Sequence, residues 1–129
     1  MFDGVHHIAI ICSDYAVSRE FYVATLGLRV VSEVYRKERS SYKLNLALPD
    51  GAEIELFSFP APPPRPTLPE ACGLRHVALR SSDFDGTLAA LKGRGVVLEP
   101  TRVDPVTGSR FTFFADPDGL PIEVYEDPA

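Results

Sequence analysis

Hydrophobic and polar positions follow helical periodicity in some segments and strand periodicity in others. The helices and strands that they predict occur in a similar order in the two halves of the chain. Residues 5–12 are an unbroken apolar run, which predicts a strand buried on both faces. Ser13 or Asp14 can cap a following helix, whose apolar stripe covers residues 17–26. Gly27 is a suitable residue to end it. Strands rich in β-branched or alternating apolar residues follow at 28–36, 42–48 and 52–59.

The second half of the chain repeats this βαβββ order. A strand is predicted over residues 74–80, and a helix from Asp83 to about Gly93. The Asp-Pro-Asp-Gly sequence at 116–119 is a strong turn signal. The remaining predicted elements are short extended pieces near 96–98 and strands over 110–115 and 120–126.

A proline-rich segment, Pro60–Pro69, separates the two sets. Its prolines favour extended polyproline conformation, so it is expected to be a semi-rigid spacer; a ligand for an SH3-type partner is the alternative. The predicted fold is α+β, a single domain over residues 1–129 built from two tandem βαβββ units. The units and their connection are expected at about 4–59, 60–73 and 74–127.

The two halves also repeat their polar residues. His7, in His-Ile-Ala-Ile, matches His76, in His-Val-Ala-Leu, at an offset of 69 (76 − 7). Glu55, in Ile-Glu-Leu-Phe, matches Glu123, in Ile-Glu-Val-Tyr, at an offset of 68 (123 − 55). If the two units are related by a pseudo-twofold axis, both histidines and both glutamates can converge on one point.

This donor set predicts a metal site. Two neutral imidazoles and two carboxylates suit a divalent ion that also keeps open positions for water or substrate. A hydrogen-bonded structural histidine and a solvated glutamate are the alternative interpretation, but it does not explain why both residue types recur. His6 is interpreted as structural or surface, because strand alternation turns it away from its neighbour. Walls for a substrate are expected from aromatic residues beside the glutamates, namely Phe57, Phe59 and Tyr125.

Composition narrows the possible partners and compartment. A net charge of -5 argues against nucleic acid, because phosphate binding needs a basic face. No apolar run approaches the roughly 20 residues that span a bilayer, so no membrane association is expected. Cys12 and Cys72 form no CxxC motif and are expected to be small buried residues. The cytoplasm is therefore the expected compartment.

These repeated motifs resemble the vicinal oxygen chelate superfamily, and within it glyoxalase I and its uncharacterised bacterial relatives. The resemblance covers nearly the whole chain. It implies that His7, Glu55, His76 and Glu123 bind one divalent metal ion, which can be Ni, Zn, Co, Mn or Fe. It implies a lyase that converts a 2-oxoaldehyde–thiol hemithioacetal to a 2-hydroxyacyl thioester through an enediolate. Glu123 is the first choice for the base, with Glu55 its symmetry-related partner.

The sequence departs from the glutathione-using enzymes where the thiol is held. Those enzymes carry an arginine four residues after the first histidine and an asparagine four residues after the first glutamate. Ile11 and Phe59 occupy these positions, which predicts poor use of glutathione. Arg110 is the favoured anchor for an anionic substrate. Other candidates are Tyr35, Arg36, Arg39, Tyr42, Lys43 and Arg102, for most of which a solvated basic surface is the alternative.

Two other classes of function stay open. One is a different metal-dependent enzyme of the same superfamily: a dioxygenase, an epimerase or a thiol transferase. The other is a small-molecule binding module of the bleomycin-resistance kind, which would not need the four ligands. The family builds its site either within one chain or between two chains. The expectation here is an intrachain site in a homodimer that acts on a small-molecule substrate.

Overall fold

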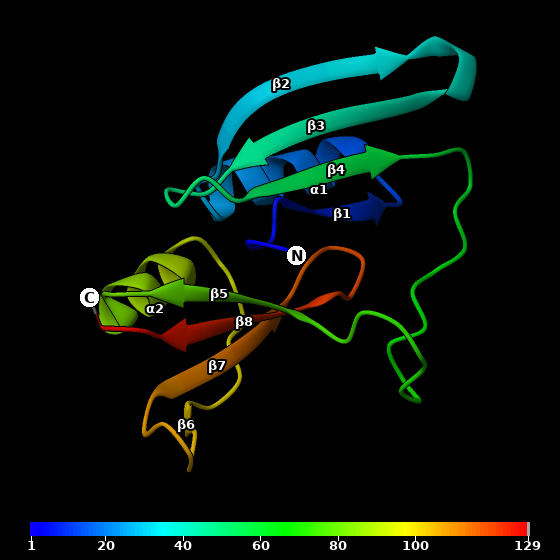
Figure 1. The fold of residues 1–129 in the computed structure, drawn as a ribbon. Coiled ribbons are helices and arrows are strands. Elements are labelled where there is room, and N and C mark those ends of the chain that lie inside the picture. The colour runs from blue at the N-terminus through cyan, green and yellow to red at the C-terminus, as the bar shows by residue number, and fades with distance from the viewer. Residues whose placement is uncertain (129) are drawn as a thin grey trace. The chain divides into compact units, whose positions relative to one another are not determined.

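The computed structural model describes residues 1–128 and divides into two compact units, Met1–Pro64 and the part from Arg65 onward (Figure 1). The first unit contains β1 (His7–Cys12), α1 (Tyr15–Glu20), η1 (Phe21–Thr25), β2 (Arg29–Arg36), η2 (Lys37–Arg39), β3 (Ser41–Ala47) and β4 (Glu53–Ser58). The second contains β5 (Val77–Ser81), α2 (Phe84–Gly93), β6 (Arg102–Val103), β7 (Arg110–Ala115) and β8 (Pro121–Glu126).

Each unit is a four-stranded sheet with the same topology. The strand order is β1-β4-β3-β2 in the first sheet and β5-β8-β7-β6 in the second. The opening strand lies parallel to the closing strand in both units, and the other neighbours are antiparallel. This confirms the predicted α+β fold of two tandem βαβββ units.

The helices begin where the sequence places their caps. The Asp14 carboxylate accepts a hydrogen bond from the Val17 amide at 3.2 Å, and Asp83 accepts from the Gly86 amide at 3.1 Å. Such caps satisfy amides that have no partner in a first helical turn. Gly27, with a φ of 73°, follows η1 in the left-handed conformation that favours glycine.

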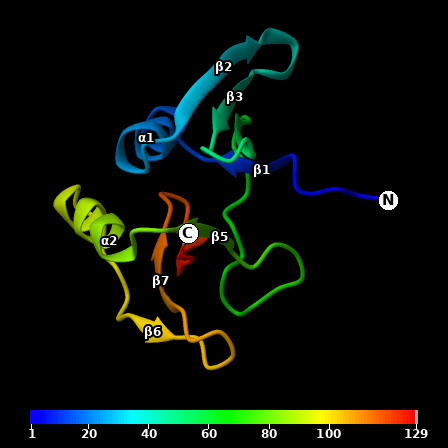
Figure 2. The same ribbon diagram turned by 60° about the vertical axis from the view of Figure 1, so that its left-hand side comes forward.

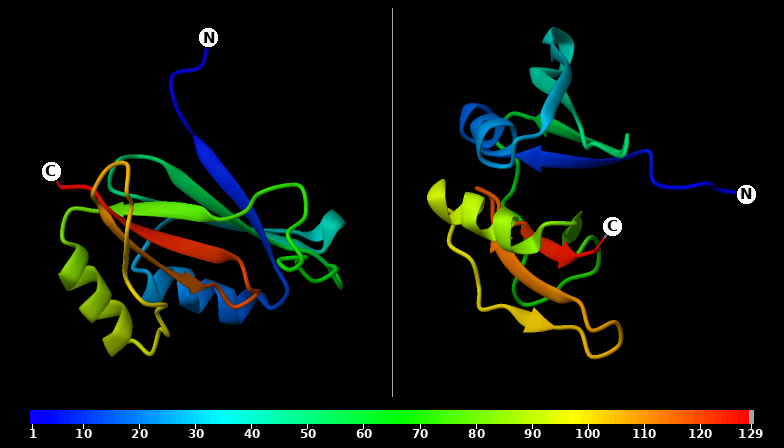
Figure 3. Two further views of the ribbon diagram at one scale, coloured as in Figure 1. Left: turned by 90° about the horizontal axis from the view of Figure 1, so that it is seen from below. Right: turned by 90° about the vertical axis from the view of Figure 1, so that its left-hand side faces the viewer.

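One face of each sheet forms a hydrophobic core with its helix (Figure 3). Leu44, Leu46 and Leu56 are fully buried in the first unit. Period-2 alternation leaves the other face of each sheet for polar and aromatic side chains. Further core residues are Ile10, Tyr22 and Ile54 in the first unit and Val77, Phe84, Leu91, Phe114, Ile122 and Val124 in the second.

Three local predictions are wrong. The first strand begins at His7 and is buried on one face only, with Ile11 55% exposed, because the helix of its unit packs against one face of the sheet. No strand forms at 96–98; instead β6 at Arg102–Val103 pairs with β7, where hairpin geometry supplies partners. Cys12 is buried as expected, whereas Cys72 is exposed in the connecting segment.

The proline-rich connection does not act as a spacer along its whole length. Its first part, up to Pro64, belongs to the first unit, and Arg65 begins the second. The Arg65 guanidinium donates to the carbonyls of Leu74 at 2.7 Å and Arg75 at 3.0 Å, and to the Thr67 hydroxyl at 3.0 Å. These bonds fold residues 65–73 into a loop beside the start of β5 (Figure 2). None of the helices formed by residues 1–128 is long and apolar enough to cross a membrane.

Candidate metal centre

The polar face of each sheet carries one histidine–glutamate pair. In the first unit Ala9 is the strand neighbour of Glu55, and His7 is the neighbour of Glu53. In the second unit Ala78 is the neighbour of Glu123, and His76 comes directly before β5. Residues paired across neighbouring strands share a face of the sheet, and so do residues two apart along a strand. Each histidine stands two residues before the alanine that pairs with its glutamate, so histidine and glutamate lie on the same face. The small alanine leaves space beside the carboxylate.

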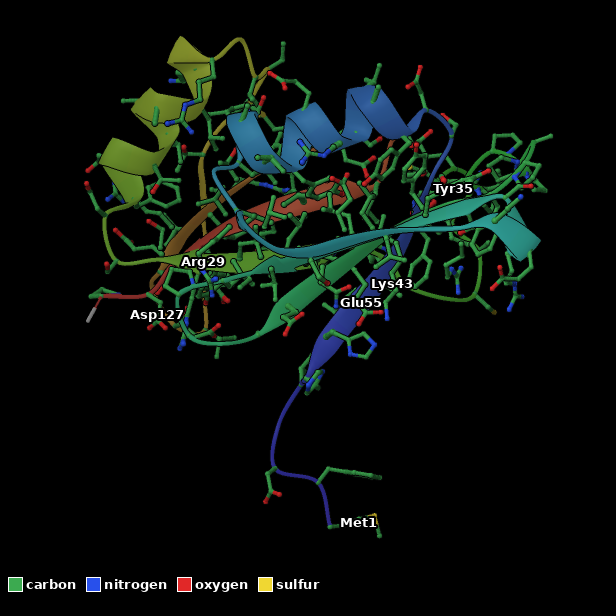
Figure 4. The ribbon with its side chains drawn as sticks, turned by 90° about the horizontal axis from the view of Figure 1, so that it is seen from above. Met1, Arg29, Tyr35, Lys43, Glu55 and Asp127 are labelled. Atoms are coloured by element: carbon green, nitrogen blue, oxygen red, sulfur yellow. The ribbon has the colours of Figure 1, made fainter. Side chains whose placement is uncertain are left out.

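In the first unit Glu55 is a buried carboxylate held by several polar groups. It is 8% exposed, and its Oε1 lies 3.6 Å from His7 Nε2. The Asn45 side-chain amide donates to Glu55 Oε2 at 3.2 Å from the adjacent strand β3. Lys43 Nζ lies 3.9 Å from Oε1, and Figure 4 shows Lys43 and Glu55 next to each other. This carboxylate is therefore fixed in orientation.

His6 contacts its neighbour, contrary to the prediction that it turns away. Its Nδ1 lies 2.8 Å from Nδ1 of His7, and the two rings meet edge to face. A hydrogen bond between two ring nitrogens requires one protonated and one unprotonated nitrogen. When Nδ1 of His7 is the donor, Nε2 of the neutral ring is unprotonated and can bind a metal ion. Histidines that bind metals commonly donate their other ring N–H to a neighbouring group, which fixes this tautomer.

In the second unit the corresponding pair is closer and has fewer partners. His76 Nε2 lies 3.0 Å from Glu123 Oε2, and Glu123 is 9% exposed. Phe113 lies opposite Glu123 in the β7–β8 ladder, and its ring packs edge to face against His76 at a centroid distance of 5.1 Å. Within residues 1–128, His76 is the one hydrogen-bonding or ionic partner of the Glu123 side chain.

The two pairs differ at one equivalent position. Asn45 and Phe113 are 68 positions apart (113 − 45), the same offset as the two glutamates, and each lies opposite its glutamate. Asn45 stabilises the Glu55 anion by a hydrogen bond, whereas the Phe113 ring offers Glu123 none. Glu55 is thus held by more polar contacts than Glu123.

The residues present fit a divalent cation. Each unit holds a nearly buried carboxylate beside an imidazole, and burying carboxylates without a compensating cation is costly. Nitrogen and oxygen donors in equal number suit Ni, Co, Mn, Fe or Zn with added waters. In the described part of the chain, no three His, Cys, Asp or Glu side chains gather into a complete site. Each unit therefore holds one histidine–glutamate pair.

The predicted aromatic walls lie on the same faces as these pairs. Phe57 and Phe59 stack at a centroid distance of 6.1 Å, and the Arg36 guanidinium lies 5.0 Å above the Phe57 ring. Tyr125 stacks on Phe111 at 6.4 Å. Its hydroxyl donates to the Asp104 carboxylate at 2.9 Å. The substrate roles of Phe57, Phe59 and Tyr125 stay predictions.

Arg110 has an evident structural role. Its guanidinium donates to Glu126 at 2.6 Å and to Asp85 at 3.0 Å, and lies 4.7 Å above the Phe84 ring. These contacts tie β7 and β8 to α2, and the hydrogen bonds from Arg110 lower the pKa of the Glu126 carboxyl. A substrate anion would compete with two carboxylates for this guanidinium. Its role as substrate anchor also stays a prediction.

Comparison with known proteins agrees with this arrangement of repeated units. The model of the Glyoxalase/Bleomycin resistance protein/Dioxygenase superfamily matches residues 4–124, and the chain belongs to this family. It is 57% identical over 123 residues to the uncharacterized protein YwkD of Bacillus subtilis (strain 168), covering 95% of this chain and 96% of that protein. It is 59% identical over 122 residues to the uncharacterized protein YaeR of Escherichia coli (strain K12), covering 95% of each.

Solved structures and one more distant relative extend the comparison. The crystal structure of the glyoxalase family protein from Enterococcus faecalis superposes with a TM-score of 0.89 at 44% identity, covering 97% of this chain and 98% of that one. The 2-epi-5-epi-valiolone epimerase of Actinomyces sp is 27% identical over 147 residues, covering 98% of this chain and 80% of that protein. The superfamily thus includes enzymes, and the match extends along nearly the whole chain.

Proposed function

We propose that the protein is a glyoxalase I-like, divalent-metal-dependent lyase. In this proposal His7, Glu55, His76 and Glu123 hold one ion, and the substrate is the hemithioacetal of a 2-oxoaldehyde and a thiol. The observation that carries the proposal is the repeated pair of a buried glutamate and an adjacent imidazole, one in each unit, with N–O distances of 3.6 and 3.0 Å. The product is the thioester of a 2-hydroxy acid.

The reaction needs one proton to leave a carbon and return to its neighbour. Glu123 Oε2 accepts the C–H proton next to the thiol sulfur, and the electron pair moves into an enediolate. The protonated Glu123 then delivers the proton to the adjacent carbon, and the hydroxyl proton of the thiol-bearing carbon passes to the oxygen of that adjacent carbon. The thiol-bearing carbon becomes a carbonyl and its neighbour an alcohol, so no external oxidant is needed. A divalent ion held by the four proposed ligands would supply Lewis-acid stabilisation of the negative charge that develops on the substrate.

The asymmetry between the two glutamates supports this division of roles. Glu55 accepts from Asn45 and lies near Lys43, so its negative charge is stabilised and its orientation fixed. Glu123 has an aromatic neighbour and a single imidazole partner within residues 1–128, so fewer polar contacts hold its carboxylate in one orientation. The histidines act as neutral ligands and keep their ring orientation through contacts with His6 and Phe113.

A thiol panel tests the proposal. Purified protein is freed of metal, reloaded separately with Ni, Co, Mn, Fe or Zn, and given methylglyoxal with different thiols while thioester formation is followed. Because Ile11 and Phe59 stand where glutathione-using enzymes carry polar anchors, glutathione should be a poor substrate beside a smaller thiol. Absence of thioester with every metal and thiol would refute the lyase. A kcat/KM with glutathione near the roughly 10⁶ M⁻¹s⁻¹ of efficient enzymes would refute the thiol assignment.

An epimerase is the second candidate. It is favoured by the likeness to the 2-epi-5-epi-valiolone epimerase and by the same pair of carboxylates, because epimerisation also removes and returns a proton beside a carbonyl. Deuterium exchange separates the two functions. An epimerase incorporates solvent deuterium at a carbon next to a ketone and needs no thiol, whereas the lyase yields no product without one.

A further inference from the structure

The second unit contains an open pocket, and the candidate ligand His76 is one of its lining residues. The cavity measures about 450 Å³. Its lining includes His76, Phe113 and most of the loop of residues 65–71. The hydrogen bonds of Arg65 to the carbonyls of Leu74 and Arg75 hold this loop in place. The pocket is thus lined by a loop that hydrogen bonds hold in place, and it includes a proposed ligand of the reaction centre.

The charge around the pocket is opposite to that of the whole protein. Three arginines, 65, 75 and 102, and two glutamates, 70 and 99, line it, which gives +1 (3 − 2) without counting His76. The chain as a whole carries -5. A positive pocket in an acidic protein attracts anions locally while the remaining surface repels them.

Arg102 is the side chain best placed to receive an anion. Its guanidinium lies 5.0 Å above the Phe111 ring and 5.6 Å above the Phe113 ring, an arrangement that holds the group in position. Stacking uses the face of the guanidinium and leaves its N–H edge available. Within residues 1–128 the Arg102 side chain makes no hydrogen bond or ion pair, and neither does that of Arg75.

Two other stacked arginines, in contrast, already use their hydrogen-bond donors. Arg36 also stacks, 5.0 Å above Phe57 and 5.9 Å above Phe59. However, Arg36 Nη2 already donates to the Ser41 hydroxyl at 2.9 Å. Arg110 is likewise engaged by two carboxylates. Among these three stacked arginines, Arg102 alone donates no side-chain hydrogen bond to any part of the chain that the structure describes.

We propose that this pocket binds an oxyanion carried by the substrate, a carboxylate or a phosphate-type group, with Arg102 as the anchor and Arg75 as a second contact. The proposal rests on the proposed function and refines it: the substrate adduct bears an acidic group, and Arg102 determines specificity for it. A guanidinium fork matches the geometry of such oxyanions.

The binding test uses metal-free protein, so it does not depend on any turnover. Inorganic phosphate, methylphosphonate and acetate are titrated separately while the NMR signals of the arginine Nε–H groups and backbone amides are followed. Saturable shifts are expected at Arg102, Arg75 and Phe113. Saturable binding of any of the three anions at these residues supports the anion site. Whether acetate or the phosphate-type anions bind more tightly then identifies the class of acid. Absence of saturable shifts at Arg102 for all three anions would overturn the proposal.

A variant series assigns the effect to the guanidinium. Arg102→Met keeps an aliphatic chain over the two phenyl rings but removes the charge, and should weaken anion binding about 10- to 100-fold, as expected for loss of charged hydrogen bonds. Arg102→Lys keeps the charge without the fork and should fall between. Lys92→Ala removes one charge from α2 of the same unit and should change binding less than about twofold. Equal binding by wild type and Arg102→Met would overturn the proposal.

A kinetic comparison connects the pocket to substrate choice. Adducts of methylglyoxal with mercaptoacetate and with 2-mercaptoethanol differ chiefly in one carboxylate. Arg102→Met should lower kcat/KM about 10-fold or more for the first through KM, and less than about twofold for the second. Equal losses for both adducts would contradict the specificity role. If wild-type protein binds the anions but has no lyase activity with either adduct, the result counts against the proposed function and not against the anion site.

Discussion

Replacing Glu123 by glutamine removes one negative charge from the candidate centre at almost constant volume. Glu123 is 9% exposed, and its side chain is bonded within the described residues to His76 alone, at 3.0 Å. The glutamine carbonyl can still accept from His76, and Phe113 needs no polar partner, so the sheet should keep its packing. Unfolding followed by circular dichroism should differ from wild type by no more than about 1–2 kcal/mol.

Catalysis should respond far more strongly than folding. A glutamine side chain cannot take up the substrate proton, and loss of a general base typically costs about 10²–10⁴-fold in rate, or about 3–5 kcal/mol in activation free energy. The assay is kcat at saturating metal, together with exchange of the substrate C–H proton with deuterated solvent. Saturating metal separates proton transfer from the weaker ion binding that loss of an anionic ligand also causes.

Glu55→Gln is the matched control, because it makes the same chemical change in the other unit. Asn45 and Lys43 hold Glu55 as a fixed anion, so its substitution should weaken metal binding with a smaller loss of kcat once metal saturates. The division of roles is wrong if Glu123→Gln retains near-normal turnover. It is equally wrong if Glu55→Gln is the variant that loses proton exchange.

Three further predictions concern stability and assembly. Leu44→Ala, at a fully buried position, should lower the free energy of unfolding by about 2–5 kcal/mol in urea denaturation, and a loss under about 1 kcal/mol would contradict the core described. Arg110→Met should destabilise at neutral pH, and the difference from wild type should shrink as pH falls through the lowered pKa of Glu126, because its ion pair contributes only while the carboxyl is ionised; a pH-independent difference would refute this. Mixing inactive His7→Ala and Glu123→Ala chains under subunit exchange should restore no activity if the site is intrachain, whereas recovery approaching half of wild type per heterodimer would show a site shared between chains.

The repeated pairs could be found from the sequence because each of their residues lies in a short motif that occurs twice. His7 begins the opening strand of the first unit and His76 directly precedes that of the second, while Glu55 and Glu123 lie in the matching closing strands. Strand periodicity alone then predicts the face of each side chain. The capping aspartates and the Asp-Pro-Asp-Gly turn are similarly local signals, and the elements they bound form as predicted.

The roles of Asn45 and Phe113 could not be predicted because they depend on strand register. Each becomes important only when β3 or β7 pairs with the strand that carries the glutamate. The 68-residue offset between them was a usable signal, since it equals that of the glutamates. The ion pairs of Arg110 could not be predicted either, because Asp85 lies 25 positions away in sequence and only the packing of α2 brings it near.

Calorimetric titration of metal-free wild type, His7→Ala and His76→Ala with a divalent ion tests whether both histidines bind the same ion. One ion should bind per chain, and either substitution should weaken this single site although the two histidines belong to different units. Each variant should lose about 10-fold or more in affinity, since removal even of an outer-shell partner typically costs 10- to 100-fold. Two independent ions per chain, one lost with each substitution, or unchanged binding in either variant, would contradict a single site that includes both histidines.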